Sequence, residues 1–300
     1  MTLPALLGDR LAIPAIVAPM FLVSGPDLVV ECCKAGLLGT FPVLNQRSSE
    51  GYGEWLDEIE GRLAGEEGAA PFGVNLIVHK SNPRLEADLE LTVRHRVPLV
   101  ITSLGAAAEV VQVVQGYGGL VFHDVTSVRH AGKAVAAGVD GLIAVAAGAG
   151  GHGGMLSPFA LVEEIRRFFS GPLALAGAIT RGQQIAAARL MGADLAYIGS
   201  HFIAAEESLA GGDQKDMMIE ANAADIVYTD RVTGIGANFL GRSLAAASVP
   251  EQHGALSLSE EARAWKTVWS AGHGVGSTQA RRSARALCDD LKHEFEATLQ

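Results

Sequence analysis

Eight apolar runs of six to eight residues recur along the first two thirds of the sequence, and stretches of helical pattern separate them. They lie at residues 15–20, 38–43, 72–78, 99–104, 120–125, 142–147, 173–179 and 195–202. The runs are apolar almost throughout, which is typical of strands covered on both faces. Their spacing of roughly 20–33 residues suits one strand–helix unit with its loops. Eight such units favour a closed (β/α)8 TIM barrel over an open doubly wound sheet.

After residue 202 this alternation stops. Helical patterns are expected over 206–224 and 257–269, with scattered glycines between them over 226–241, and a final helix is expected over 280–299. We therefore predict an α/β protein in which a barrel spans residues 1–210. A smaller, mostly helical insertion at 211–276 would sit beside the barrel mouth on the substrate side. The C-terminal helix, within 277–300, would pack back on the barrel.

Composition narrows the classes of function. The chain of 300 residues is 49% hydrophobic and 19% charged, which fits a large core, and its net charge of −10 argues against nucleic acid or an anionic membrane as partner. Cys32, Cys33 and Cys288 give neither a disulfide framework nor a metal-binding pair. The apolar run at 11–23 is interrupted by prolines and too short to span a membrane, and no signal peptide is recognisable. The expectation is a soluble, cytoplasmic protein.

The sixth apolar run leads into a glycine loop at 148–154 that carries one imidazole, His152. A helix start follows, with Ser157 as a plausible N-cap and Pro158 at the first helical position. Strand, glycine loop and helix together are typical of a site for a phosphorylated cofactor.

One alternative for this loop is a dinucleotide-binding fingerprint. Gly148, Gly150 and Gly153 satisfy the spacing G-x-G-x-x-G. That fingerprint also requires an acidic residue about 20 residues further on, to hold a ribose. The next apolar run, 173–179, contains no Asp or Glu, so we disfavour this interpretation.

In a barrel, the active site lies at the carboxyl ends of the strands and in the loops that follow. These ends are small or polar without charge, except at the fifth strand, where His123 and Asp124 are adjacent and the sequence does not show which faces inward. No cluster suits a metal ion, so none is expected. Gly177-Ala178 and Gly199-Ser200 end the seventh and eighth strands, where barrels often bind a phosphate through backbone N–H groups. The competing interpretation is that these glycines only relieve steric crowding where helices pack on the strands.

His152 could equally be a solvated loop residue. Its place over the end of the sixth strand, between glycines, favours a role as base or hydrogen-bond donor near neutral pH. Trp265 and Trp269 could line the site from the insertion or pack within it.

Several motifs together resemble the nitronate monooxygenase family, formerly called 2-nitropropane dioxygenases, which are FMN-containing barrels related to flavin-dependent enoyl reductases. The matching segments are APM at 18–20, GVNL at 73–76, GGHG at 150–153, GAI at 177–179, GAD at 192–194, IGSHF at 198–202 and AGHGVG at 271–276. The resemblance runs in order over nearly the whole chain.

The resemblance implies roles for individual residues. His152 would be the catalytic histidine beside the flavin. The cofactor-binding residues would be Ala18, Pro19, Met20 and Asn75 around the ring and ribityl chain, with Gly150, Gly177, Ala178, Gly199 and Ser200 at the lower chain and phosphate. Asp124 is added to this set, although some relatives have a lysine there, and the departure leaves the substrate open.

The implied activity is FMN-dependent oxidation of alkyl nitronates, and of nitroalkanes, by O2 to carbonyl compounds and nitrite. An alternative keeps FMN and changes the reaction to NAD(P)H-dependent reduction of an enoyl or acyl thioester or a quinone. A third interpretation is a barrel that binds a phosphorylated ligand without turnover. Small-molecule partners, and a homodimer, are expected.

Overall fold

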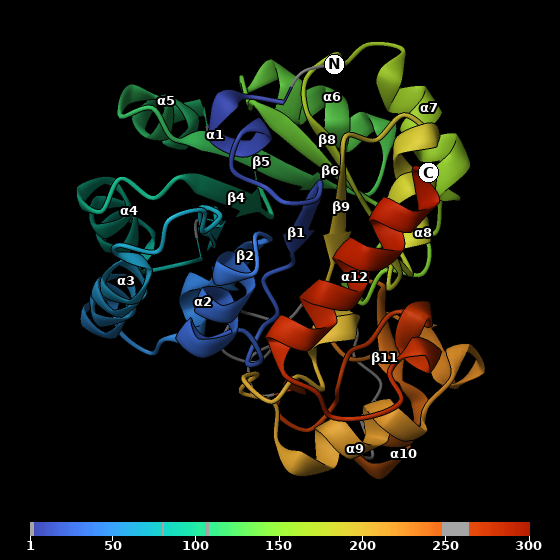
Figure 1. Ribbon diagram of the computed structural model, residues 1–300. Coiled ribbons are helices and arrows are strands. Elements are labelled where there is room, and N and C mark those ends of the chain that lie inside the picture. Colours follow the sequence, from blue (N-terminus) through green and yellow to red (C-terminus); the bar gives the residue numbers. More distant parts are fainter. Residues whose placement is uncertain (1–2, 80, 106–107, 248–263) are drawn as a thin grey trace.

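Eight parallel strands close into a barrel in the order β1-β2-β3-β4-β5-β6-β8-β9, which confirms the predicted fold class (Figure 1). The structure is a computed structural model and describes residues 3–79, 81–105, 108–247 and 264–300. The barrel strands are β1 (Ala15–Val17), β2 (Leu38–Pro42), β3 (Gly73–Ile77), β4 (Leu99–Ser103), β5 (Leu120–Val125), β6 (Gly141–Val145), β8 (Leu173–Ala176) and β9 (Leu195–Ile198). Each lies within or at one residue of a predicted apolar run.

Helices surround the barrel, and the short α1 lies at its amino end. They are α1 (Ala5–Gly8), α2 (Pro26–Lys34), α3 (Ser49–Leu63), α4 (Leu85–Arg94), α5 (Ala108–Gly116), α6 (Val128–Ala136), α7 (Pro158–Arg166), α8 (Gly182–Leu190) and α12 (Ala284–Thr298). Helix α12 packs on α8 and α2 on the outside of the barrel (Figure 1). Among the helices of the described ranges, none is long and apolar enough to cross a membrane.

The predicted helix starts are partly correct. Ser157 and Pro158 begin α7 as expected, although the Ser157 side chain makes no capping hydrogen bond. Helix α8 begins at Gly182 with Arg181 at its N-cap. The Gln184 side chain accepts hydrogen bonds from the backbone N–H groups of Thr180 (2.7 Å) and Arg181 (3.1 Å).

The described residues of the insertion hold strands as well as helices. The insertion contains the helices α9 (Gly212–Glu220) and α10 (Gly241–Ala247). It also contains an antiparallel hairpin of β10 (Ile226–Thr229) and β11 (Ala237–Leu240), in a segment where the sequence showed only scattered glycines and predicted no strand. Strand β11 also pairs with β7 (Gly151–His152), so the insertion adds a small sheet to the glycine loop. Figure 1 shows this lobe outside the barrel, beyond the strands. The helix expected over 257–269 falls largely outside the described residues.

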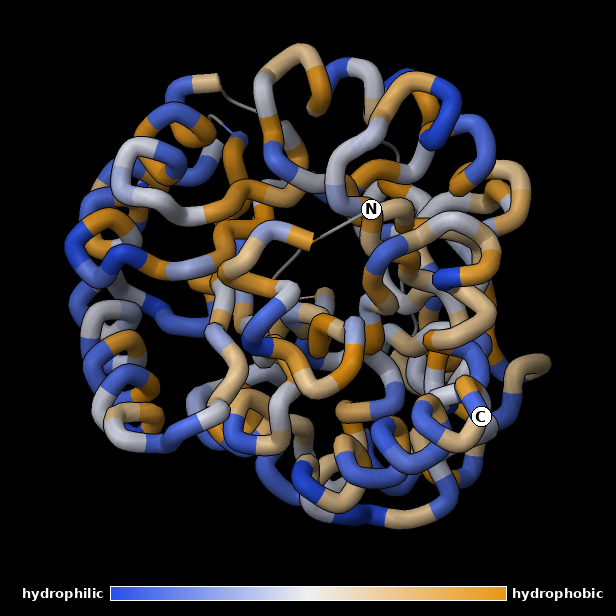
Figure 2. Tube along the Cα trace, turned by 45° about the horizontal axis from the view of Figure 1, so that its top comes forward, coloured by the Kyte–Doolittle hydropathy of each residue, from blue (hydrophilic) through white to orange (hydrophobic). Residues whose placement is uncertain are grey.

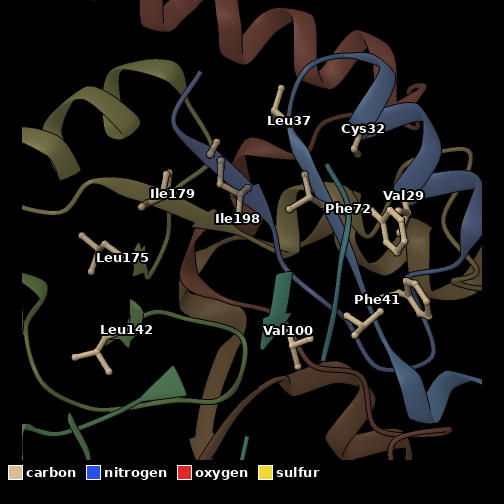
Figure 3. Packing of buried hydrophobic residues seen from close by; sticks show 14 of the residues in the cluster. Val29, Cys32, Leu37, Phe41, Phe72, Val100, Leu142, Leu175, Ile179 and Ile198 are labelled. Carbon is tan, nitrogen blue, oxygen red and sulfur yellow. The ribbon is translucent and has the colours of Figure 1, made fainter. Parts of the chain in front are cut away.

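The apolar core has two layers. One lies between strands and helices, and Phe41, Val100, Leu142, Leu175 and Ile198 belong to it (Figure 3). The other fills the barrel interior, with Leu7 of α1 beneath it. Its strand residues are Ile16, Leu38, Leu99, Ile101, Phe122, Ile143, Val145, Ala174, Ala176 and Leu195. In Figure 2, hydrophobic segments concentrate toward the strands while the surrounding helices carry much of the hydrophilic colour. Full burial contributes about 1.5–3 kcal/mol for each large aliphatic side chain, so these layers account for the closed barrel.

Candidate active site

A cavity of about 780 Å³ opens at the carboxyl ends of the barrel strands. It is lined by every residue that the sequence marked as catalytic or cofactor-binding: Ala18, Pro19, Met20, Asn75, Asp124, Gly150, His152, Gly177, Ala178, Gly199 and Ser200. The insertion contributes Ile235, Trp265 and Trp269 to the same wall. The volume is in the range of cofactor and ligand sites in enzymes.

Unbonded amide groups gather on the side of the cavity formed by β8 and β9. In the described part of the chain, the backbone N–H groups of Ala178, Ile179, Ser200 and His201 donate no hydrogen bond to another protein group. Main-chain donors near a protein interior are normally paired, and converging unpaired donors suit an anion such as a phosphate. This side of the cavity is where the sequence predicted phosphate binding.

The glycines at these strand ends have different structural reasons. Gly177 has φ +142°, and a Cβ there would lie 2.9 Å from the carbonyl oxygen of Ala147. A Cβ at Gly199 would make only ordinary contacts, 3.5 Å from the Ala18 Cβ, so the fold alone does not require glycine there. At Gly150 a Cβ would lie 2.8 Å from the amide nitrogen of Gly272, so this glycine allows close packing on the 271–272 segment near the end of the insertion.

Backbone strain is concentrated at the cavity. Four non-glycine residues of the described chain have positive φ, and Leu22 (60°), Leu104 (59°) and Ala178 (54°) all line the cavity. Such conformations cost on the order of 1–3 kcal/mol each and cluster at ligand sites, because surrounding structure must enforce them.

His152 lies on β7, and the insertion holds its ring. Its Nε2 is 3.1 Å from Oγ1 of Thr233, which is buried in the turn between β10 and β11. The ring also meets Trp265 edge-on, with centroids 5.7 Å apart. The Thr233 hydroxyl is 3.1 Å from the carbonyl oxygen of Ile235, to which it donates. This pairing favours the tautomer of His152 with hydrogen on Nε2 and the lone pair on Nδ1.

Three polar side chains from neighbouring strands form a chain of hydrogen bonds beside the cavity. Asn75 Nδ2 donates to the Ile101 carbonyl oxygen (3.2 Å) and to Ser103 Oγ (2.7 Å). Ser103 Oγ donates to Asp124 Oδ2 at 2.5 Å. Burial raises the pKa of Asp124 to about 6, although the hydrogen bond from Ser103 opposes the increase.

The structure also decides which of His123 and Asp124 faces inward. Asp124 shares the interior face of β5 with Phe122, whereas His123 points to the opposite face, with Nδ1 2.8 Å from Thr102 Oγ1. Burial lowers the pKa of His123 to about 4, so its ring is neutral at physiological pH. Across the interior, burial raises the pKa of Tyr197 on β9 well above its usual range, and the charge of Asp124 adds to that effect.

A family model described as nitronate monooxygenase matches residues 7–291. The chain belongs to the nitronate monooxygenase family. A nitronate monooxygenase of Paraburkholderia phytofirmans is 26% identical, with 78% of this chain and 75% of that protein covered. A Rhodococcus jostii dehydrogenase named for an octahydroindene-carboxyl-CoA is 24% identical, over 77% of this chain and 63% of its own length.

Among solved structures, a nitroalkane oxidase from Streptomyces ansochromogenes is 25% identical, with a TM-score of 0.85 over 98% of this chain and 99% of that one. Some curated relatives are longer, and this chain spans 65%, 63% and 61% of three of them. Membership of the nitronate monooxygenase family makes this protein an oxidoreductase, and the family is flavin-dependent.

The residues of the cavity fit a flavin. The unpaired N–H groups at β8 and β9 suit a phosphate, and the space over Gly199 that a Cβ would fill leaves room for a ligand. Asn75 and Asp124 each keep one side-chain oxygen on the cavity side that forms no hydrogen bond with the described residues. A flavin ring carries both donors and acceptors along its polar edge, which these oxygens complement.

Sequence reasoning missed three residues of the site. Ser103 lies at a strand end in the sequence, but only its bonds to two other strands reveal its role. Tyr197 lies inside an apolar run, and only the closed barrel turns it toward Asp124. Thr233 is 81 residues from His152, and no local pattern links them. In the described residues, one ligand atom each of Asp57, Glu60 and His95 lies within 4.8 Å of the other two, which would allow a metal ion between them. None of these three residues lines the cavity.

Proposed function

We propose that this protein is an FMN-dependent enzyme that oxidises alkyl nitronates, and nitroalkanes, with O2 to carbonyl compounds and nitrite. The observation that carries the proposal is His152, which Thr233 holds on the wall of a cavity that also offers a phosphate site. A mononucleotide is favoured over a dinucleotide, because the apolar run after the glycine loop, 173–179, carries no acidic residue that could hold a second ribose.

The cofactor roles follow the layout of the cavity. Gly177, Ala178, Gly199 and Ser200 would surround the phosphate. Ala18, Pro19, Met20, Asn75 and Asp124 would line the ring and ribityl chain. Gly150 would act indirectly, through its close packing on the 271–272 segment. When bound, the flavin would supply the redox group that takes electrons from the nitronate and passes them to O2.

His152 would act on the substrate in one of two ways. With a nitronate, which is already an anion, the protonated ring donates a hydrogen bond to a nitro oxygen and orients the substrate. With a neutral nitroalkane, the proton moves from the α-carbon to the imidazole of His152, and Thr233 keeps the ring oriented through Nε2. The protein walls exclude water and place the substrate against the cofactor.

A second candidate keeps FMN and replaces the reaction with NAD(P)H-dependent reduction of an enoyl or acyl thioester or a quinone. The similarity to a dehydrogenase named for a CoA thioester favours it. His130 and Lys133, at the edge of the cavity on α6, would suit an anionic part of a larger substrate. Anaerobic mixing with a nitronate, and separately with NADH and NADPH, distinguishes the two reactions by which of them bleaches the flavin.

The test of the proposal is His152→Ala. We expect turnover of a neutral nitroalkane to fall by about 10²–10⁴-fold, because the base is lost, and turnover of a preformed nitronate to fall much less. FMN content should stay near that of the wild type, since the phosphate site lies elsewhere. His130→Ala, a histidine at the cavity edge, is the matched control and should change neither rate greatly. Equal small losses for both substrates would assign His152 to the structure of the loop.

Two further expectations belong to this proposal. Small-molecule substrates and O2 would be the reactants, with neither nucleic acid nor membrane as a partner. The protein would act in the cytoplasm as a homodimer, and sedimentation equilibrium at micromolar concentration would establish the number of subunits.

A further inference from the structure

The hydrogen-bond chain from Asn75 to Asp124 has a fixed direction. The Asn75 amide must turn its NH2 group toward the Ile101 carbonyl oxygen, because the flipped amide would place two acceptors against each other. The second proton of that NH2 group then goes to Ser103 Oγ. Ser103 has one hydroxyl proton, so it donates that proton to Asp124 Oδ2.

This direction determines where Asp124 can carry a proton. Oδ2 already accepts the short hydrogen bond from Ser103, so a proton added to the carboxylate resides on Oδ1. Oδ1 makes no hydrogen bond with the described residues, and Asp124 lines the cavity. The carboxyl group therefore presents a donor to the cavity when it is protonated and an acceptor when it is ionised.

We propose that Asp124 is a proton-exchanging residue of the flavin site, which donates a hydrogen bond from Oδ1 to the bound flavin when protonated and accepts one when ionised. The proton exchanges with solvent water, and Ser103 and Asn75 are positioning residues that keep it on the cavity side. The inference rests on the proposed flavin site but not on the choice between nitronate oxidation and thioester reduction.

The surroundings of Asp124 allow this exchange near neutral pH. Burial raises its pKa to about 6. Tyr197 faces it from β9 and stays neutral, because its own pKa is well above its usual range. His123 is on the opposite face of β5, where it bonds Thr102, and His130 and Lys133 reach the edge of the cavity from α6. Among the described residues that line the cavity, Asp124 is the one carboxylate.

Three histidines, His123, His130 and His152, also line the cavity. An experiment on the flavin-bound protein must therefore separate Asp124 from these histidines. Reduction adds negative charge to a flavin, which a protonated Asp124 stabilises and an ionised Asp124 opposes. The reduction potential should consequently fall more steeply with pH around the titration of Asp124 than it does in its absence.

The test follows the visible absorption and the reduction potential of the flavin-bound protein between about pH 5 and pH 8. We expect one spectral titration near pH 6 in the wild type, its retention in His152→Gln, His130→Gln and His123→Gln, and its loss in Asp124→Asn. Above that pH, Asp124→Asn should have a more positive potential than the wild type. Persistence of the titration in Asp124→Asn, or its loss in His152→Gln, would overturn the proposal.

Ser103→Ala keeps the proposal testable if Asp124→Asn retains too little flavin. Removing a hydrogen bond to the ionised carboxylate should move the titration to higher pH, and an unchanged midpoint would contradict the assigned role of Ser103. None of these measurements uses a nitronate. A protein that fails to oxidise nitronates but shows this titration would refute the proposed substrate and leave the role of Asp124 standing.

Discussion

Replacing Asp124 by Asn should stabilise the flavin-free protein at neutral pH. The Asp124 side chain is half-buried at the cavity, and desolvation there raises its pKa from 3.8 to about 6 on folding. An increase of this size corresponds to about 3 kcal/mol of free energy that favours the protonated form, at 1.36 kcal/mol for each pKa unit. Asn has nearly the same shape, can accept the hydrogen bond from Ser103, and carries no charge to desolvate.

The sign of the pH dependence follows from the direction of the change. A carboxyl group with a raised pKa stabilises the folded state fully below the pKa of the unfolded chain, and this contribution is lost as the pH rises through the folded pKa of about 6. The wild type therefore bears the full cost of the buried charge above about pH 7. The gain in Asp124→Asn should be about 3 kcal/mol there and should fall below about 1 kcal/mol at pH 4.

Urea unfolding of both proteins without flavin, at about pH 4, 5.5 and 7.5, measures this difference. Using one protein pair at each pH cancels the contribution of the other titrating groups. A difference in free energy of unfolding that does not vary with pH would refute the raised pKa of Asp124. A stabilised variant with altered flavin properties would show that the site carries a charge that the fold alone disfavours.

Three other substitutions and one control test the cavity and the packing around it. Gly199→Leu should leave the barrel folded, since a Cβ there makes only ordinary contacts, but should reduce the FMN retained after gel filtration by blocking the phosphate. Lys215→Met should lower the free energy of unfolding by about 2–4 kcal/mol, because the buried ammonium bonds three loop carbonyl oxygens that would lose their donor. Gly182→Ala should cost about 3 kcal/mol or more, because its Cβ would lie 2.1 Å from the Phe295 amide nitrogen; Gly61→Ala, in open space on α3, should be neutral or slightly stabilising. Wild-type flavin content in the first variant, or unchanged urea midpoints in the other two, would contradict these contacts.

The sequence by itself determined the barrel, because eight buried strands carry their apolar character locally and their spacing leaves room for one helix each. It also determined which loops meet, since the carboxyl ends of parallel strands share one rim. For that reason residues as distant as Ala18 and Ser200 line the same cavity as predicted. Whether they bind FMN stays a prediction.

The tertiary structure decided what depends on contacts between distant segments. The hairpin of β10 and β11 gains its stability by pairing with β7, so its short strands could not be recognised from a glycine-containing segment alone. The inward direction of Asp124 depends on the register of β5 in the closed barrel, because adjacent strand residues face opposite sides. The hydrogen bond between Thr233 and His152 joins positions that only the folded insertion brings together, and pairwise contacts of this kind leave no periodic signal in a sequence.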